Sequence, residues 1–303
     1  MITSRTPRPS TSPLPDVTQQ VAACEVRLGP EPPSDHRPPR RFPAAARVVL
    51  AVAMMFAAIS AMLPVMLIPG LGTALEAWPL PGQAVVQVVL TGLVTLAALA
   101  LVALAMRFVD RRPLADVGWR WTKRALPALM IGLGAAIVTT LGVALAVEAS
   151  GLTRPVDPAQ FTGGAPVWLV IPVALATAFL LQGIPEELIW RGYVLQTLPI
   201  SPVAAIYVSA TVFAALHVVS SGGQQSWWEH LVYLAVPFGF SLLASGLLLH
   251  TGSLWAAVGV HGGLHVALAI GVLWLSIGEG PWLWASIGLV QSLLGAWLIR
   301  RAT

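Results

Sequence analysis

Charged residues are scarce in this chain of 303 residues, where they make up only 10% of the composition. Ordinary soluble domains carry about 25% charged residues. Hydrophobic residues reach 56%, and the mean hydropathy is +0.78. So little charge excludes a soluble domain and predicts an integral, multi-pass membrane protein of the cell membrane, with the lipid bilayer as its first partner.

The sequence also has a single cysteine, and it lacks two motifs that are common in hydrolases. Cys24 is the only cysteine, so no disulfide can form within the chain and thiol chemistry is not expected. HExxH does not occur, which excludes a soluble zincin. GxSxG is absent as well, and no serine has a convincing nucleophile setting.

The 17 basic residues are concentrated in a few segments of the chain. Seven arginines precede residue 48, six basic residues lie between 107 and 124, and Arg300 and Arg301 lie at the C-terminal end. Clusters of this kind are typical of cytoplasmic loops under the positive-inside rule. They do not resemble a DNA-binding face, so we expect no nucleic acid as a partner.

Residues 1–43 contain ten prolines among Ser, Thr and Arg. We predict a disordered cytoplasmic tail there, because the segment buries too little apolar surface to offset its ordering entropy. From Ala44 onward the chain consists of apolar runs near the length of about 20 residues that a spanning helix needs. Pro, Gly and charged stretches separate the runs.

The apolar runs predict an all-α membrane bundle of eight transmembrane helices. We place them at about 46–68, 83–106, 125–148, 166–184 (helical to about 197), 201–217, 229–249, 254–276 and 282–299. Eight spans put both termini on one side. The basic segments then all fall on the cytoplasmic side, so the predicted topology is N-in and C-in.

The fourth span carries charges that a bilayer disfavours, in the sequence IPEELIWRGY at 184–193. Glu187 and Arg191 are four residues apart, so they share a helix face and can pair. Glu186 points about 100° away from Glu187 and is left to face a neighbouring helix. The structural alternative is an ion cluster that only locks helix packing.

Histidines occur in two later spans. FAALH places His217 near the end of the fifth span, where an interfacial role is the alternative. GVHGGLHVA places His261 and His265 four residues apart on one face of the seventh span. Gly259 and Gly263 form a small-residue pattern that lets neighbouring helices approach closely.

A glutamate, a nearby histidine and a further pair of imidazoles inside a membrane suit water-activated hydrolysis. A carboxylate withdrawn from bulk water can accept a proton from water near neutral pH, and a histidine beside it can share that water. The two further side chains can donate to a developing oxyanion, or with the others hold a metal. Such a site would have to be assembled from three helices.

The motifs EELIWR, FAALH and GSLWAAVGVHGGLH resemble, in order and spacing, the EExxxR, FxxxH and HxxxN motifs of the CPBP intramembrane proteases (CAAX proteases and bacteriocin-processing enzymes, or Abi proteins). The resemblance covers about residues 166–270. It implies Glu186 as the water-activating base assisted by His217, and Glu187 with Arg191 as internal support. His261 and His265 would bind the oxyanion, with His265 standing where Asn is usual.

This resemblance implies an intramembrane endopeptidase that acts on membrane-associated peptide or protein substrates. The domain organisation we expect is a tail at 1–43, three spans at 44–165, the protease core at 166–276, and a last span with a basic end at 277–303. Zinc is a candidate cofactor, because His217, His261 and His265 have suitable ligand types.

Two other classes of function stay open. One is a non-catalytic scaffold or bacteriocin-immunity protein of the same fold, which His265 favours. The other is a proton-coupled transporter, but the sequence shows no inverted repeat, and its intramembrane polar residues crowd into the second half.

Overall fold

The computed structural model describes residues 42–303, and all side chains there except that of residue 160. The tail predicted at 1–43 therefore lies almost wholly outside the described residues. Within residues 42–303 the chain is helical and has no strand, which confirms the predicted all-α class.

The helices follow one another with short connectors. They are α2 (Ala44–Ile59), α3 (Leu63–Met66), α4 (Leu71–Glu76), α5 (Leu80–Leu104), α6 (Ala125–Ala149), α7 (Pro158–Thr162), α8 (Val167–Ala176), α9 (Ile184–Glu187), α10 (Leu195–Thr197), α11 (Pro202–Leu216), α12 (Trp227–Tyr233), α13 (Ala235–Thr251), α14 (Leu254–Leu275) and α15 (Pro281–Ala302). Wider π-helical turns and tight 3₁₀ turns join several of them into longer rods.

Eight of these rods are long and apolar enough to cross a membrane, as predicted. They run over Ala44–Met66, Leu80–Asp110, Ala125–Ala149, Val167–Thr197, Pro202–Val219, Trp227–Thr251, Leu254–Leu275 and Pro281–Ala302. The direction in which they cross the bilayer stays a prediction.

The second span is longer at both ends than the predicted 83–106. Its start is earlier because Pro81 lies in the first helical turn, where a missing N–H costs no hydrogen bond. Its end is later because the helix continues through a π-helical turn to Asp110. The Asp110 carboxylate pairs there with the buried side chain of Arg47 from α2, which lets a charged residue remain in the rod.

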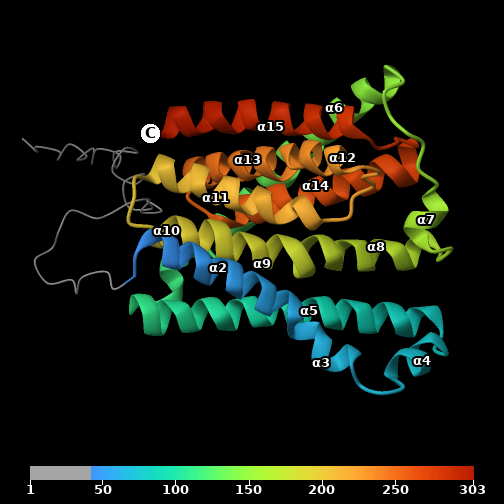
Figure 1. Ribbon diagram of the computed structural model, residues 1–303, viewed down its shortest axis with the longest axis horizontal. Helices are drawn as coiled ribbons and strands as arrows, with labels where there is room; N and C mark the ends of the chain where they lie inside the picture. The colour runs from blue at the N-terminus through green and yellow to red at the C-terminus, as the bar shows by residue number, and fades with distance from the viewer. Residues whose placement is uncertain (1–41) are drawn as a thin grey trace, which may run out of the picture.

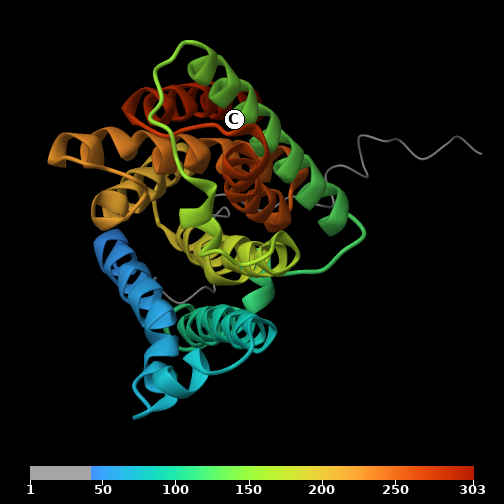
Figure 2. The same cartoon turned by 90° about the vertical axis from the view of Figure 1, so that its right-hand side faces the viewer.

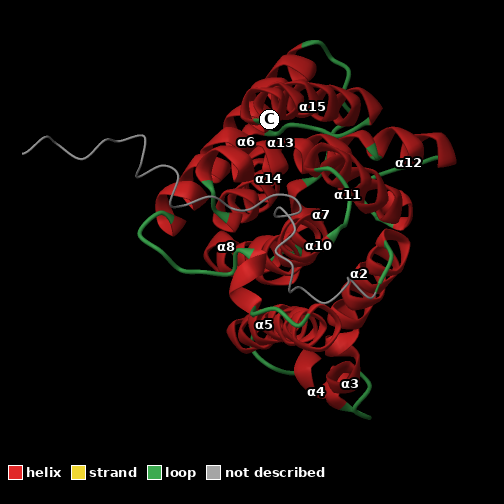
Figure 3. Ribbon diagram, turned by 90° about the vertical axis from the view of Figure 1, so that its left-hand side faces the viewer, coloured by secondary structure: helices red, strands yellow, loops and turns green. Residues whose placement is uncertain are grey.

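The fourth span lies in the middle of the molecule (Figure 1). Spans one and two lie on one side of it, and α6, α11, α13, α14 and α15 lie on the other (Figure 2, Figure 3). Because it packs between these two groups, its side chains at 186–191 are buried from all directions. The predicted charges therefore face protein rather than lipid.

The seventh span packs closely against the third through glycines. A Cβ on Gly259 would overlap the carbonyl of Leu129 in α6, and a Cβ on Gly132 would overlap the carbonyl of Ala256 in α14. The two backbones are thus in direct contact, as the small-residue pattern predicts. This contact fixes the position of α14, the helix that carries His261 and His265.

Candidate active site

Glu186 and Glu187 lie in α9, a short α-helical stretch within the fourth span. Wider π-helical turns flank it, at Thr177–Gly183 before and Leu188–Val194 after. Pro185 has no N–H to donate, and its ring would clash with the carbonyl of a regular preceding turn. The wider turn before α9 relieves this conflict, and π-helical turns are frequent at functional sites.

Glu187 and Arg191 form a salt bridge that is fully enclosed by protein. Arg191 Nη1 donates to Glu187 Oε1 at 3.1 Å, and both side chains are 0% exposed. The guanidinium carbon of Arg191 also lies 5.0 Å from the ring centre of Phe213 and 5.9 Å from that of Phe240. Aromatic faces stabilise a desolvated cation. The predicted pair is present, and rings from α11 and α13 support it.

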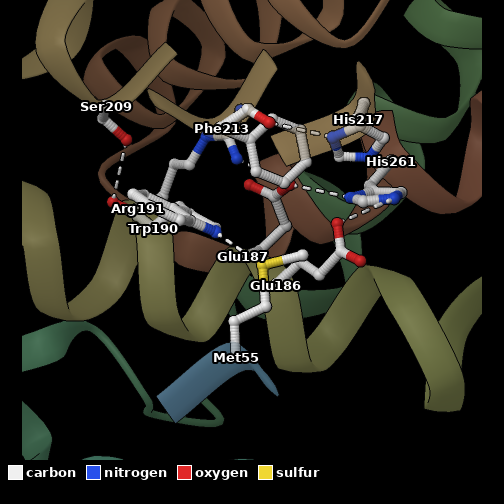
Figure 4. Close-up of polar contacts among 9 residues, drawn as sticks. All are labelled: Met55, Glu186, Glu187, Trp190, Arg191, Ser209, Phe213, His217 and His261. Atoms are coloured by element: carbon white, nitrogen blue, oxygen red, sulfur yellow. Dashed lines mark hydrogen bonds and ion pairs between the residues drawn. The ribbon is translucent and has the colours of Figure 1, made fainter. Parts of the chain in front are cut away.

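His261 lies against both glutamates (Figure 4). Its Nδ1 forms a 2.9 Å hydrogen bond with Glu187 Oε1, the same oxygen that Arg191 contacts. Its Nε2 lies 3.8 Å from Glu186 Oε2, which is beyond hydrogen-bond range. The imidazole is therefore fixed at one nitrogen by Glu187 and turns the other nitrogen toward Glu186.

The Glu186 carboxylate forms no hydrogen bond within residues 42–303, whereas Glu187 binds Arg191 and His261 through Oε1. The Oε2 of Glu186 is enclosed, and no donor reaches it within residues 42–303. Glu187 Oε2 and two nitrogens of Arg191 are unpaired in the same way. Buried polar atoms of native proteins nearly always have a protein or water partner. The cluster can thus bind a water molecule or a polar substrate group beside Glu186.

His217 lies at the end of α11, on the same side of the cluster as His261 (Figure 4). Its Nδ1 bonds the carbonyl of Phe213 at 2.9 Å, which leaves Nε2 free. The ring of Phe213 lies 4.6 Å from that of His217 and 6.3 Å from that of His261. No hydrogen bond joins His217 to Glu186 in the described part of the chain.

His265 stacks on His261, with ring centres 5.3 Å apart and planes at 23°. It is half-buried and lies one turn farther along α14, as the i,i+4 spacing predicts. The structure thus brings all six predicted residues to one region, from the three helical spans that the sequence indicated. Glu187 and His261 are in direct contact, which the sequence did not predict.

A zinc site would need at least three of these side chains to converge on one point. Among residues 42–303, no three His, Cys, Asp or Glu side chains lie together in an arrangement that could hold a metal ion. His261 Nδ1 is engaged by Glu187, and His217 Nδ1 by a backbone carbonyl. The side chains as placed do not form a zinc site.

Sequence reasoning missed several residues that position the cluster. Trp190 is fully buried, and its indole N–H points to Met55 Sδ of α2 at 3.4 Å. Ser209 of α11 donates to the Trp190 carbonyl at 3.4 Å (Figure 4). These residues look like ordinary span residues in the sequence, so no local pattern could have identified them.

One family model matches the chain. Residues 167–267 match the family described as type II CAAX prenyl endopeptidase, Rce1-like. The matched segment contains Glu186, His217, His261 and His265, and it confirms the resemblance to the CPBP and CAAX proteases. No curated protein matches the chain. With eight apolar helices, the match shows a multi-pass membrane protein that carries a protease domain of the CAAX type.

Proposed function

We propose that this protease domain hydrolyses peptide bonds of membrane-associated proteins or peptides with a water molecule activated by Glu186. One observation carries the proposal. Glu186 Oε2 is buried and unpaired, 3.8 Å from His261 Nε2, while the adjacent Glu187 is occupied by Arg191 and His261. Two neighbouring carboxylates in different environments are a common basis for acid–base catalysis.

Glu186 would accept a proton from the water as the oxygen attacks the peptide carbonyl. His217, with Nδ1 engaged by a backbone carbonyl, offers its free Nε2 to the same water. The proton on Glu186 can then pass to the leaving amine. Both groups are held by helices, so little reorganisation is needed during the reaction.

The developing oxyanion would be stabilised by the two imidazoles of α14. With Nδ1 donating to the Glu187 carboxylate, His261 would donate from Nε2 to the developing oxyanion as the doubly protonated imidazolium, whose charge Glu187 balances. His265 stacks beside it and can donate from the next turn. Glu187 and Arg191 act through His261, which they orient and support electrostatically.

The proposed mechanism assigns no step to zinc, because the predicted ligands do not converge on one point within residues 42–303. Metal analysis of the purified protein would test whether zinc is bound. A non-catalytic scaffold or bacteriocin-immunity protein is the second candidate, and His265 at the usual Asn position favours it. The name of the matched family suggests prenylated CAAX proteins as a substrate class.

The test uses purified full-length protein and an internally quenched, farnesylated CAAX peptide, with the unprenylated peptide in parallel. The wild type should cleave at least one of them, and Glu186→Gln should lower the rate by about 100-fold or more, as loss of a general base does. The melting temperature should not change. Equal cleavage by both proteins would exclude Glu186 as the base, and inactivity of the wild type would favour the scaffold.

A further inference from the structure

The π-helical turn before α9 leaves one backbone carbonyl of the fourth span without a backbone donor. Within this turn, Thr177–Gly183, the carbonyls pair with N–H groups five residues farther along, and Ile184 N donates to the Phe179 carbonyl. The same spacing assigns the next carbonyl, that of Leu180, to residue 185. Residue 185 is a proline, which has no N–H. The open acceptor therefore lies one turn before the two glutamates.

A threonine of the second span supplies the missing donor. Thr95 Oγ1 of α5 donates to the Leu180 carbonyl at 2.5 Å, and the threonine is buried. The bilayer core has no water for a freed carbonyl, and Ser or Thr side chains can satisfy the backbone groups that a proline frees in a membrane helix. Thr91, one turn earlier on α5, instead donates to the Val88 carbonyl of its own helix at 2.8 Å. Thr95 thus serves the fourth span.

The same turn also rests on α14, beside His261. A Cβ on Gly262 would overlap the ring of Phe179, and a Cβ on Gly183 would lie 3.6 Å from Gly262 N. Both α5 and α14 pack against this turn. A hydrogen bond from one helix and close packing against the other therefore hold the turn in its wider form.

The spacing of this turn determines where Glu186 points. A π-helical turn contains about one residue more than an α-helical turn, and one residue corresponds to about 100° of rotation. If the turn closed to α-helical spacing, Glu186 would rotate by about that angle away from its present position, 3.8 Å from His261 Nε2. Glu187 would rotate with it and lose its contact with His261 Nδ1.

We infer that Thr95 is a positioning residue for the proposed base. Its hydrogen bond to the Leu180 carbonyl keeps the π-helical turn open and Glu186 directed at His261. The effect on catalysis rests on the proposed function, whereas the effect on the turn does not. Thr95 belongs to none of the three motifs and acts only through the position of Glu186. Its loss should therefore change kcat more than KM.

The first test compares Thr95→Val, which removes the donor, with the matched control Thr91→Val on the same helix. With the farnesylated CAAX peptide, the kcat of Thr95→Val should fall by about 10-fold or more, because the base is misplaced, while KM stays within about twofold. Thr95→Ser keeps the hydroxyl and should recover most of the loss. A kcat of Thr95→Val equal to that of Thr91→Val, or an equal loss in Thr95→Ser, would overturn the inference.

A second test uses Pro185. Pro185→Ala adds an N–H to the helix, so the Leu180 carbonyl no longer depends on Thr95. In this background, Thr95→Val should change the kcat and the melting temperature much less than it does in the wild type. Effects of the two substitutions that simply add would overturn the inference.

Amide hydrogen exchange separates this inference from the proposed function, because it needs no cleavage. The amides of residues 181–190 should exchange faster in Thr95→Val than in the wild type, since a stranded carbonyl favours local opening. Thr91→Val should match the wild type there. Unchanged exchange in Thr95→Val would overturn the inference even in an active enzyme. Faster exchange in a protein that cleaves no peptide would support the role of Thr95 in the turn and contradict the proposed function.

Discussion

Glu187 is the residue on which the charges of the candidate active site converge. Its Oε1 accepts a hydrogen bond from Arg191 and contacts His261 Nδ1, and it is 0% exposed. Removal of one partner of a buried ion pair typically costs about 3–5 kcal/mol, because the other charge is stranded. Glu187→Ala should therefore lower the melting temperature in detergent, whereas Glu186→Gln should not. Equal melting temperatures for the two variants would contradict the division of roles.

His265 distinguishes catalysis by hydrogen-bond donors from catalysis with a metal. His265→Asn supplies an amide donor near the same depth, so activity should persist or rise if the imidazole only donates. If His265 ligates zinc, metal content and activity should fall together, and a chelator should inhibit the wild type. Metal analysis of the purified protein, with peptide cleavage measured alongside, separates the two.

Glu279, which two backbone hydrogen bonds join to Arg154, predicts a pH-dependent stability. Burial raises the pKa of Glu279 above its usual value, Arg154 opposes this in part, and the like charge of Glu229 adds to it. A carboxyl with a raised pKa in the folded state loses stability as pH rises from its unfolded pKa through its folded one. Glu279→Gln should therefore melt above the wild type at pH 8, and the two should converge near pH 4. A difference that grows toward acid pH would refute this.

At the scale of elements, the contact between α6 and α14 leaves no room for an added methyl group at Gly132. Gly132→Ala should lower the melting temperature and the activity, because its Cβ would overlap the Ala256 carbonyl and displace the helix that carries His261. Gly134→Ala on the same helix is the matched control, since nothing lies within 4 Å of its Cβ. Thermal melts of the two variants decide, and equal values would show that the helices can separate at no cost.

The eight spans were predictable because each depends on local composition, and their bounds agree within a few residues. The π-helical turns around α9 were not predicted, because they reflect Pro185 together with packing on both sides. The glycines of the loop 220–226 also have reasons that only the structure shows. Gly222 lies against Tyr233, and Gly223 has a φ of +86° beside Glu279.

At the scale of the whole molecule, the N-in topology can be tested with the natural cysteine. Cys24 lies outside the described residues, in the segment that we predict to be cytoplasmic. A membrane-impermeant maleimide should modify Cys24 only after the cells are lysed. In a Cys24→Ser background, Ser221→Cys in the loop 220–226 should react on intact cells. The reverse pattern would invert the topology.

The residue types of the site could be read from the sequence, but the contacts among them could not. The spacing of four residues was enough to predict the pair of Glu187 and Arg191, because one helix determines it. The bond between Glu187 and His261 joins residues 74 positions apart and depends on how two spans pack.

Assembly of the site from three spans also has a consequence for biosynthesis. A nascent chain that has emerged from the ribosome up to the fifth span already contains Glu186 and His217. It still lacks His261, which lies in the seventh span and engages Glu187. The proposed catalytic groups therefore come together only after most of the chain has been inserted. A half-made protein would therefore lack the proposed oxyanion donors, and the proposed hydrolysis would begin only after the seventh span has been inserted.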